Sequence, residues 1–311
     1  MKVAVVSGGF SEENEASRKS GKCISGALET LGHNVFLIEY DENLISNLRK
    51  VSPDIVFHSV MGKYHGDGAV QALLEFAGMP YVGSRPQNAA IINHKTICKK
   101  IWRADGKIPT PDFFEYGYEE YKKDSFEKFQ EKVKKNGLTL PIVAKPPTQG
   151  NRYGIVFVKD SLSFKELEAS FCFDNVLLAE RYVEGRFYTQ GIIEINGKMT
   201  VLPPVEIIDS SDSEFKLFPG GSVTRAHDLT PECLEEISAI TLNAAFLTGA
   251  SCYGRLDYHL SGGKLQLLEI NAVPGLIPGY SSMTDCAGQA GYDYAEFIDM
   301  LLATAKGGRS E

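Results

Sequence analysis

Three oxygen-bearing side chains near the C-terminus have the spacing of a metal site. Asp257 lies in the run GRLDYH, and Glu269 and Asn271 follow in LLEIN, directly before a Pro-Gly pair. The segment 252–271 reads as two strands joined by a Gly-Gly turn, which places Asp257 roughly opposite Glu269. Carboxylate and amide oxygens suit Mg²⁺, which bridges substrate phosphates. The alternative is a surface hairpin with scattered acidic residues, but the apolar run before Glu269 favours the metal site.

A second group of residues could hold phosphate. Lys145 follows the apolar run PIVA, and the loop 149–154 (QGNRYG) then lies between two apparent strands. Such a loop can present backbone N–H groups to phosphate oxygens, although it is not a Walker loop, which needs GxxxxGK[ST] before a helix. Neither feature is specific alone, because most lysines are simply solvated.

A third candidate lies at the start of the chain. Gly8 and Gly9 follow a strand, and Glu15 lies early in the next helix. A helix N-terminus in this position commonly holds an anion or the carboxylate of a zwitterion, and Glu15 could then meet an ammonium group. An acid that complements the helix dipole explains Glu15 equally well.

Composition limits the classes of function. The 311 residues, 43% of them apolar, are enough for two or three domains with a buried core. No apolar run approaches the roughly 18–20 residues that span a bilayer, and MKVAVVSGG lacks the apolar region of a signal peptide, so we expect a cytoplasmic protein without membrane contact. A net charge of −8 argues against nucleic-acid binding. The six cysteines lack metal-like spacing, and we expect them to be reduced and mostly buried.

The order of elements predicts an α/β protein. Up to about residue 85, strand-like runs alternate with helical ones, which indicates a parallel sheet. Further along, apolar positions 126, 129 and 133 predict an amphipathic helix, and Asn-Gly at 196–197 predicts a hairpin. The run SSDSEFKLFPGGSVT has the composition of a long polar loop. A helix should follow, with Thr230 as its N-cap and Pro231 at its first position.

Taken in order, these segments resemble the ATP-grasp carboxylate–amine ligases, and within them the D-alanine–D-alanine ligase family. The matching runs are GGFSEENEASRKSG, GDGAVQALLEFAGMPYVGS, VAKP, LLAERYVEGR, GRLDY and LEINAVPGL. The resemblance covers nearly the whole chain. It implies an ATP-grasp fold of the α/β (α+β) class with an N-terminal Rossmann-like domain. The implied ranges are 1–87 for that substrate domain, 88–184 for a central ATP-grasp subdomain and 185–311 for a C-terminal domain with the metal site.

The resemblance also implies roles for individual residues. Glu15 matches the acid that meets the first substrate's ammonium group, Arg255 and Gly275 match the donors to the oxyanion, and Ser281 or Ser282 would hold the second substrate's carboxylate. Asp257, Glu269 and Asn271 match the ligands of Mg²⁺ (or Mn²⁺). The positions that match ATP contacts are Lys95, Lys145, Asn151, Arg152, Glu180, Tyr182, Val183 and Lys216.

The implied function is an ATP-dependent ligase that joins two amino acids through an acyl phosphate, D-alanine being the default substrate and a homodimer the expected assembly. The chain departs from the family in several places. Met61 replaces a histidine, which His65 could replace spatially; Phe187 replaces the acid that holds the ribose; and Leu217 replaces a tyrosine. Two alternatives follow: the same chemistry with a D-hydroxy acid, D-serine or an L-amino acid, and a nucleotide-binding regulator without ligase activity.

Overall fold

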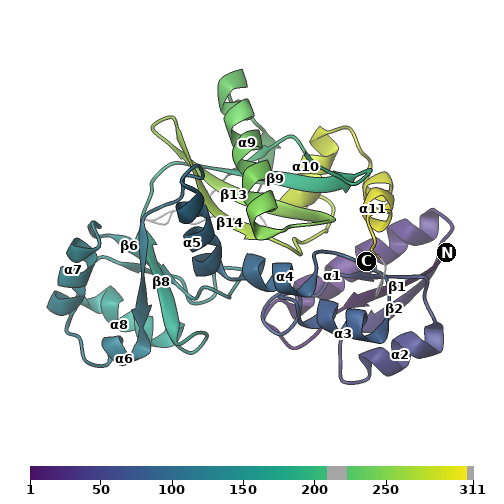
Figure 1. The fold of residues 1–311 in the computed structure, drawn as a ribbon, viewed down its shortest axis with the longest axis horizontal. Helices are drawn as coiled ribbons and strands as arrows, with labels where there is room; N and C mark the ends of the chain where they lie inside the picture. Colours follow the sequence, from purple (N-terminus) through teal and green to yellow (C-terminus); the bar gives the residue numbers. More distant parts are fainter. Residues whose placement is uncertain (209–222, 307–311) are drawn as a thin grey trace.

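The computed structural model describes residues 1–208 and 223–306, which form three β-sheets arranged along the long axis of the molecule (Figure 1). The N-terminal sheet lies at one end, the second sheet at the other, and the third sheet between them. This arrangement brings the ends of strands from different sheets toward a common centre, where the site described below is found.

The N-terminal sheet is the parallel sheet that the sequence predicts. Its strand order is β2-β1-β3-β4, and every pairing is parallel. In β1 five of six residues are buried, as expected for a central strand covered on both faces. The elements are β1 (Lys2–Ser7), α1 (Asn14–Thr30), β2 (Asn34–Glu39), α2 (Leu44–Val51), β3 (Ile55–His58), α3 (Ala69–Ala77) and β4 (Tyr81–Val82).

Two helices, α4 (Pro86–Asn93) and α5 (Lys95–Asp105), lead to the second sheet, whose order is β5-β8-β6-β7 and whose pairings are antiparallel. Phe129 and Val133 of α7 are buried, so the predicted amphipathic helix is confirmed. The elements are β5 (Phe113–Gly117), α6 (Tyr118–Tyr121), α7 (Phe126–Lys135), β6 (Ile142–Lys145), β7 (Val156–Val158), α8 (Ser161–Ser170) and β8 (Val176–Arg181).

The third sheet is antiparallel, with the order β12-β11-β9-β13-β14 and β10 paired to β9. The turn at 196–197 and the cap of α9 are as predicted: Thr230 Oγ1 accepts from Cys233 N, and Pro231 is the first helical residue. The elements are β9 (Arg186–Ile195), β10 (Lys198–Val201), β11 (Val205–Ile208), β12 (Val223–Ala226), α9 (Pro231–Thr248), β13 (Tyr253–Ser261), β14 (Lys264–Asn271), α10 (Ser282–Gln289) and α11 (Tyr294–Leu302).

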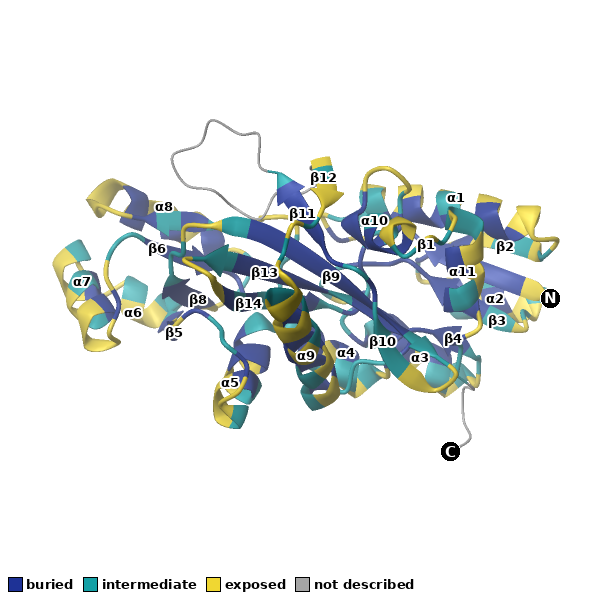
Figure 2. Cartoon of the chain, turned by 90° about the horizontal axis from the view of Figure 1, so that it is seen from above, coloured by how far each residue is buried: buried dark blue, intermediate teal, exposed yellow. Residues whose placement is uncertain are grey.

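The cores connect parts of the chain that are distant in sequence. Figure 2 shows β9 and β13 as largely buried strands, with α9 exposed along its outer side. Trp102 of α5 and Ile237 of α9 belong to one buried cluster, and Phe297 of α11 and Val5 of β1 belong to another. The three sheets fall within the three ranges implied by the resemblance, but α5 packs on the third sheet's core, so the domain boundaries stay a prediction.

Two further expectations from composition can be compared with the fold. Within the described part of the chain, no helix combines the length and apolar character that crossing a membrane requires. All six cysteines are free, and three of them, Cys98, Cys252 and Cys286, are buried. The prediction of reduced cysteines therefore agrees with the structure, while that of mostly buried ones holds for half of them.

Candidate active site

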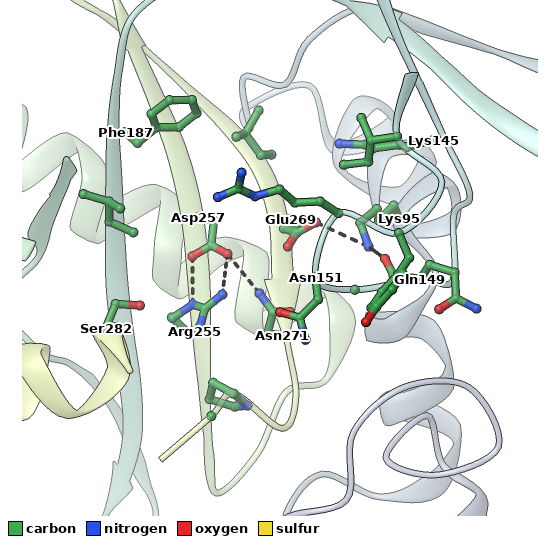
Figure 3. Close-up of a pocket in the computed structure, with 18 of the residues that line it drawn as sticks. Lys95, Lys145, Gln149, Asn151, Phe187, Arg255, Asp257, Glu269, Asn271 and Ser282 are labelled. Atoms are coloured by element: carbon green, nitrogen blue, oxygen red, sulfur yellow. Dashed lines mark hydrogen bonds and ion pairs between the residues drawn. The ribbon is translucent and has the colours of Figure 1, made fainter. Parts of the chain in front are cut away.

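A cavity of about 350 Å³ lies where the three sheets meet (Figure 3). Its lining comes from the turn after β1, the start of α5, the β6–β7 loop, the end of β8 and the β13–β14 hairpin. The predicted site residues in this lining are Lys95, Lys145, Asn151, Arg152, Glu180, Tyr182, Val183, Arg255, Asp257, Glu269, Asn271, Gly275 and Ser281. The structure thus brings together residues that span most of the sequence.

The β13–β14 hairpin has the register that the sequence predicts. Asp257 pairs with Glu269 and Arg255 with Asn271, and a bulge follows directly after Asp257. Residues that face each other in an antiparallel pair project from the same side of the sheet, which here is the side that lines the cavity. The hairpin therefore supplies two carboxylates, an amide and a guanidinium group to one small region.

Asp257 is fully buried and engaged on both oxygens. Arg255 Nε donates to Oδ1 at 2.9 Å, and an Arg255 terminal nitrogen donates to Oδ2 at 2.7 Å (Figure 3). Thr189 Oγ1 donates to Oδ1 at 2.7 Å, and Asn271 Nδ2 donates to Oδ2 at 3.1 Å. This bidentate pair fixes the guanidinium plane, so that Arg255 is held in place at the wall of the cavity.

Glu269 is paired with the cation at the start of α5. Lys95 Nζ lies 3.4 Å from Glu269 Oε2 and donates to the carbonyl oxygen of Gln149 at 2.7 Å (Figure 3). Burial would raise the pKa of Glu269, but the charges of Lys95, Lys145 and Arg255 outweigh it and lower that pKa. Lys95 therefore joins the hairpin carboxylate to the β6–β7 loop.

A second acid, Glu180 at the end of β8, is held by two lysines. Lys145 Nζ lies 2.5 Å from Oε1, and Lys99 Nζ lies 3.0 Å from Oε2. Burial favours the neutral acid, but the two ammonium groups prevail and lower the pKa of Glu180 to about 2. Lys99 is fully buried and donates to Thr110 Oγ1, and burial lowers its pKa to about 8. The sequence analysis missed Lys99, although it lies one helical turn after Lys95.

The loop 149–154 is the predicted connection between β6 and β7. Asn151 and Arg152 both have left-handed φ angles, 46° and 65°. Asn151 Nδ2 donates to Glu13 Oε1 at 2.8 Å, and a Cβ atom at Gly150 would lie 2.8 Å from the same oxygen. Glycine at 150 therefore permits a close approach between this loop and the turn after β1.

Glu15 does not reach the cavity, and its predicted placement is corrected by the structure. Its side chain is 78% exposed and pairs with Lys19 one turn along α1. Glu13, which precedes the helix, lines the cavity instead, and burial raises its pKa. Since α1 begins at Asn14, residue 13 faces the cavity, while residue 15 faces solvent. Both acids occur in the same motif, and only the helix start distinguishes them.

His65 is also placed differently from the sequence expectation. Its Nε2 accepts from Phe10 N at 2.7 Å, and its Nδ1 lies 2.5 Å from the carbonyl oxygen of Lys63. Both ring nitrogens therefore bond backbone groups, and the ring braces the turn after β1. Met61, by contrast, lines the cavity. His65 consequently does not take the place of the missing histidine at position 61.

The segment after β14 lines the end of the cavity that lies away from β8. Ser281 Oγ accepts from Ile277 N at 3.0 Å, which leaves its hydroxyl proton for another acceptor. A Cβ atom at Gly275 would lie 2.9 Å from Ser281 Oγ, so a larger residue here would displace the Ser281 hydroxyl. Ser282 lines the same end (Figure 3). Lys216 and Leu217 of the predicted polar loop lie outside the described residues.

Comparison with known proteins identifies the family. A family model described as the C-terminus of D-Ala–D-Ala ligase matches residues 101–303. A D-alanine–D-alanine ligase of Moorella thermoacetica is 34% identical over 98% of this chain and 99% of its own, and one of Carboxydothermus hydrogenoformans is 33% identical over the full length of both. A crystal structure of the Bacillus anthracis D-alanine–D-alanine ligase with ATP superposes with a TM-score of 0.80 at 29% identity, covering 98% and 96% of the two chains.

The chain belongs to the D-alanine–D-alanine ligase family. The resemblance found in the sequence, the ATP-grasp fold and the enzyme class, an ATP-dependent carboxylate–amine ligase, are thereby confirmed. The family does not assign roles to individual residues of this chain, and these are inferred from the geometry of the cavity.

The hairpin residues have the chemistry required to hold a divalent cation. Asp257 is a buried carboxylate and Glu269 a partly buried one in direct cross-strand register, and burial together with the charge of Glu269 raises the pKa of Asp257. Arg255 and Lys95 supply positive charge to the two acids in this structure. Asn271 turns its NH₂ group toward Asp257, so its amide oxygen is the atom that could ligate a cation. Hard oxygen donors of this kind fit Mg²⁺.

Proposed function

We propose that this protein joins two molecules of D-alanine in a reaction that consumes ATP and requires Mg²⁺ or Mn²⁺. The observation that carries the proposal is the convergence of Asp257, Glu269 and Asn271 with Arg255 at the wall of a cavity that also holds Lys95 and Lys145. Two carboxylates beside three cationic side chains form a site for a metal-bound polyphosphate. The relatives named D-alanine–D-alanine ligase support the choice of substrate.

ATP would lie across the cavity with its phosphates toward the hairpin. Asp257, Glu269 and Asn271 would hold the Mg²⁺, which when bound neutralises phosphate charge and orients the transferred group. Lys95, Lys145 and the backbone of the 149–154 loop, with Arg152, would add positive charge and N–H donors. Glu180, Tyr182 and Val183 would face the base at the far end.

The first amino acid would lie between the turn after β1 and the segment after β14. Glu13 takes the role first assigned to Glu15, because its carboxylate faces the cavity and can meet an ammonium group. The substrate carboxylate oxygen would attack the γ-phosphorus of ATP, giving an acyl phosphate and ADP. Catalysis in such transfers comes from positioning and charge stabilisation rather than from covalent chemistry by the protein.

In the second step the amine of the second amino acid attacks the carbonyl carbon of the acyl phosphate. The oxygen of the tetrahedral intermediate gains negative charge, and Arg255 with the Gly275 N–H would stabilise it. The hydroxyl of Ser281 would donate to the second substrate's carboxylate. Phosphate then leaves, the amine loses a proton, and the amide bond remains.

A panel of substrates tests this proposal. Purified protein is incubated with ATP, Mg²⁺ and pairs of acids and amines, and phosphate release is measured with the product identified by mass. D-alanine alone should give D-alanyl-D-alanine and one phosphate per amide. Turnover only with a D-hydroxy acid, D-serine or an L-amino acid would reject D-alanine but keep the chemistry. ATP binding without turnover for any pair would favour a nucleotide-binding regulator.

Assembly and location are part of the same proposal. A homodimer and a cytoplasmic location would suit a ligase that uses ATP and free amino acids, with no nucleic-acid or membrane partner. Sedimentation of the purified protein tests the dimer, since a monomer at working concentrations would reject it. Fractionation of the source cells tests the location.

A further inference from the structure

His259 is a buried side chain in the cavity to which neither the sequence analysis nor the reaction described above gives a role. Its side chain is 4% exposed and lines the cavity, and its Nδ1 has no hydrogen-bond partner within residues 1–208 and 223–306. A neutral imidazole carries one hydrogen-bond donor and one acceptor. Protein atoms seal Nδ1 from solvent, so the side of the ring that carries Nε2 is the one that can meet a ligand in the cavity.

The strand places His259 between the two ends of the cavity. It follows Asp257 by two residues on β13, so the two side chains share a face about 6–7 Å apart. Glu180 and Tyr182, at and just after the end of β8, line the same cavity as His259. The ring therefore lies between the hairpin carboxylates and the segment that begins at Glu180.

The neighbour of His259 on β9 is apolar. Phe187 is its register partner, and the two rings meet edge-on at 85° with centroids 4.2 Å apart (Phe187 is labelled in Figure 3). Phe187 is 4% exposed and has no side-chain atom that can accept a hydrogen bond from a ligand. Glu184, the acid closest to it before β9, is exposed. Of the two packed rings, His259 is therefore the one that offers polar atoms to a ligand.

We propose that the His259 imidazole hydrogen-bonds a ribose hydroxyl of the bound nucleotide and makes the site selective for ribonucleotides. The proposal rests on the orientation of ATP given above. With the phosphates at Asp257 and Glu269 and the base at Glu180, the ribose is the part of ATP that passes His259. Phe187 packs against the ring and limits its rotation, so the hydrogen bond has a fixed direction.

Binding of sugar-modified nucleotides tests this assignment. Calorimetry with Mg²⁺ compares ATP, 2′-deoxy-ATP and 3′-deoxy-ATP on the wild-type protein without amino acids. At least one deoxy nucleotide should bind about 5–30-fold more weakly than ATP, the range expected for one lost hydrogen bond to a buried partner. His259→Met, which keeps the volume but removes the polar atoms, should reduce this ratio to about one. His259→Gln, which keeps a donor and an acceptor, should restore part of it.

Glu184→Gln is the matched control, because it changes a polar residue near the same wall that is exposed. Its ATP to deoxy-ATP ratio should equal that of the wild type. Equal binding of all three nucleotides by the wild type, or unchanged discrimination in His259→Met, would overturn the assignment. Loss of discrimination in Glu184→Gln would overturn it in favour of that acid. If the wild type does not bind ATP at all, the proposed function itself fails, which is a different result.

Discussion

Two groups of acids line the cavity, and they are neutralised in different ways. At the hairpin, Asp257 and Glu269 are paired with Arg255 and Lys95, and all four side chains line the cavity. At the end of β8, Glu180 is paired with Lys145 in the cavity wall and also with Lys99, which is fully buried. The 3.4 Å pair of Glu269 with Lys95 is therefore open to rearrangement by a ligand, whereas Glu180 has a counter-ion that a ligand does not reach.

This difference matches the different tasks that we propose. Glu269 would exchange Lys95 for the metal, so a partner that can move is suitable there, while Arg255 stays on Asp257. Glu180 must remain ionised and fixed while Lys145 turns to the phosphates. Lys99 can supply its charge throughout, because a buried carboxylate without any partner would be strongly destabilising. Lys99 is on this view a positioning residue, acting through Glu180.

The largest effect is expected at the hairpin. Asp257→Asn removes one charge from the proposed metal site and the bidentate partner of Arg255, so phosphate release should fall by at least about 10²-fold. Glu269→Gln should behave similarly and need more Mg²⁺ for half-maximal rate. Both are measured as steady-state ATP turnover with D-alanine, with folding checked by circular dichroism.

The control for these substitutions is Glu119→Gln, which changes an acid that pairs with Lys122 at the surface. It should leave turnover and Mg²⁺ dependence unchanged. Turnover of Asp257→Asn close to that of the control would contradict the proposed metal site. Removal of divalent cations from the wild type with EDTA should abolish turnover, and added Mg²⁺ should restore it.

The second prediction concerns Lys99. Lys99→Met leaves Glu180 with Lys145 alone, and loss of one partner of a buried pair should cost about 3 kcal/mol of stability. The remaining Lys145 should be held more tightly by Glu180, so the KM for ATP should rise. Urea unfolding and ATP kinetics measure the two effects.

Two further variants test whether Lys99 is the permanent counter-ion of Glu180. Lys99→Met combined with Glu180→Gln removes the charge that lost its partner, and should recover part of the stability but not the ATP affinity. Lys100→Met changes the adjacent lysine, which is 56% exposed and pairs with Glu115, and should change stability by less than about 0.5 kcal/mol. Equal unfolding of Lys99→Met and Lys100→Met would show that Lys99 is not the permanent counter-ion.

The hairpin acids could be predicted from the sequence better than the surroundings of Glu180, because only the hairpin is encoded by a local pattern. The Gly-Gly turn and the alternation of side chains made the hairpin and the approximate meeting of its acids predictable. They would set Asp257 opposite Leu268, and only the bulge after Asp257 brings Glu269 into direct register. The pairing of Glu180 with Lys99 joins an element at 95–105 to one at 176–181, and no local pattern encodes such a contact. Glu13 was missed because the choice between Glu13 and Glu15 depends on the residue at which α1 begins, and the sequence pattern does not give helix ends that accurately.

A third prediction concerns the pH dependence of stability, which a buried histidine without a counter-ion should affect. His58 at the end of β3 is fully buried, its ring nitrogens have no hydrogen-bond partner in the described parts of the chain, and burial lowers its pKa to about 4. Between pH 6.5 and pH 4 the unfolded state therefore binds more protons than the folded state. This stability contribution is complete above pH 6.5 and is lost as the pH falls through 4, by up to about 3 kcal/mol.

His58→Leu isolates this contribution. Stability from urea unfolding at several pH values should fall less steeply on acidification in the variant than in the wild type. The control is His33→Gln, whose imidazole lies beside Asp299 with 14% exposure. If wild type and His58→Leu lose stability in parallel between pH 6.5 and pH 4, His58 does not titrate as its burial implies.

The smallest effect is expected at the contact that holds the 149–154 loop between the two acid groups. Lys63 Nζ, from the segment after β3, lies 3.0 Å from Asp174 Oδ1 and donates to the carbonyl oxygen of Phe173. Asp174 Oδ2 in turn accepts from the backbone N and the hydroxyl of Thr148, at the start of the loop. The segment after β3 therefore braces the loop through Asp174.

Lys63→Ala should cost less than about 1 kcal/mol of stability, because Lys63 is 31% exposed and solvent screens the pair. Its effect on activity should be an increase in the KM for ATP of at most about fivefold, with kcat nearly unchanged, since the loop is loosened while Asp257 and Glu180 stay in place. Lys19→Ala, which breaks an exposed pair with Glu15, should change neither constant. A fall in kcat without a change in KM would mean that Lys63 acts on the chemical step, and the loop would then belong with the hairpin acids rather than between the two groups.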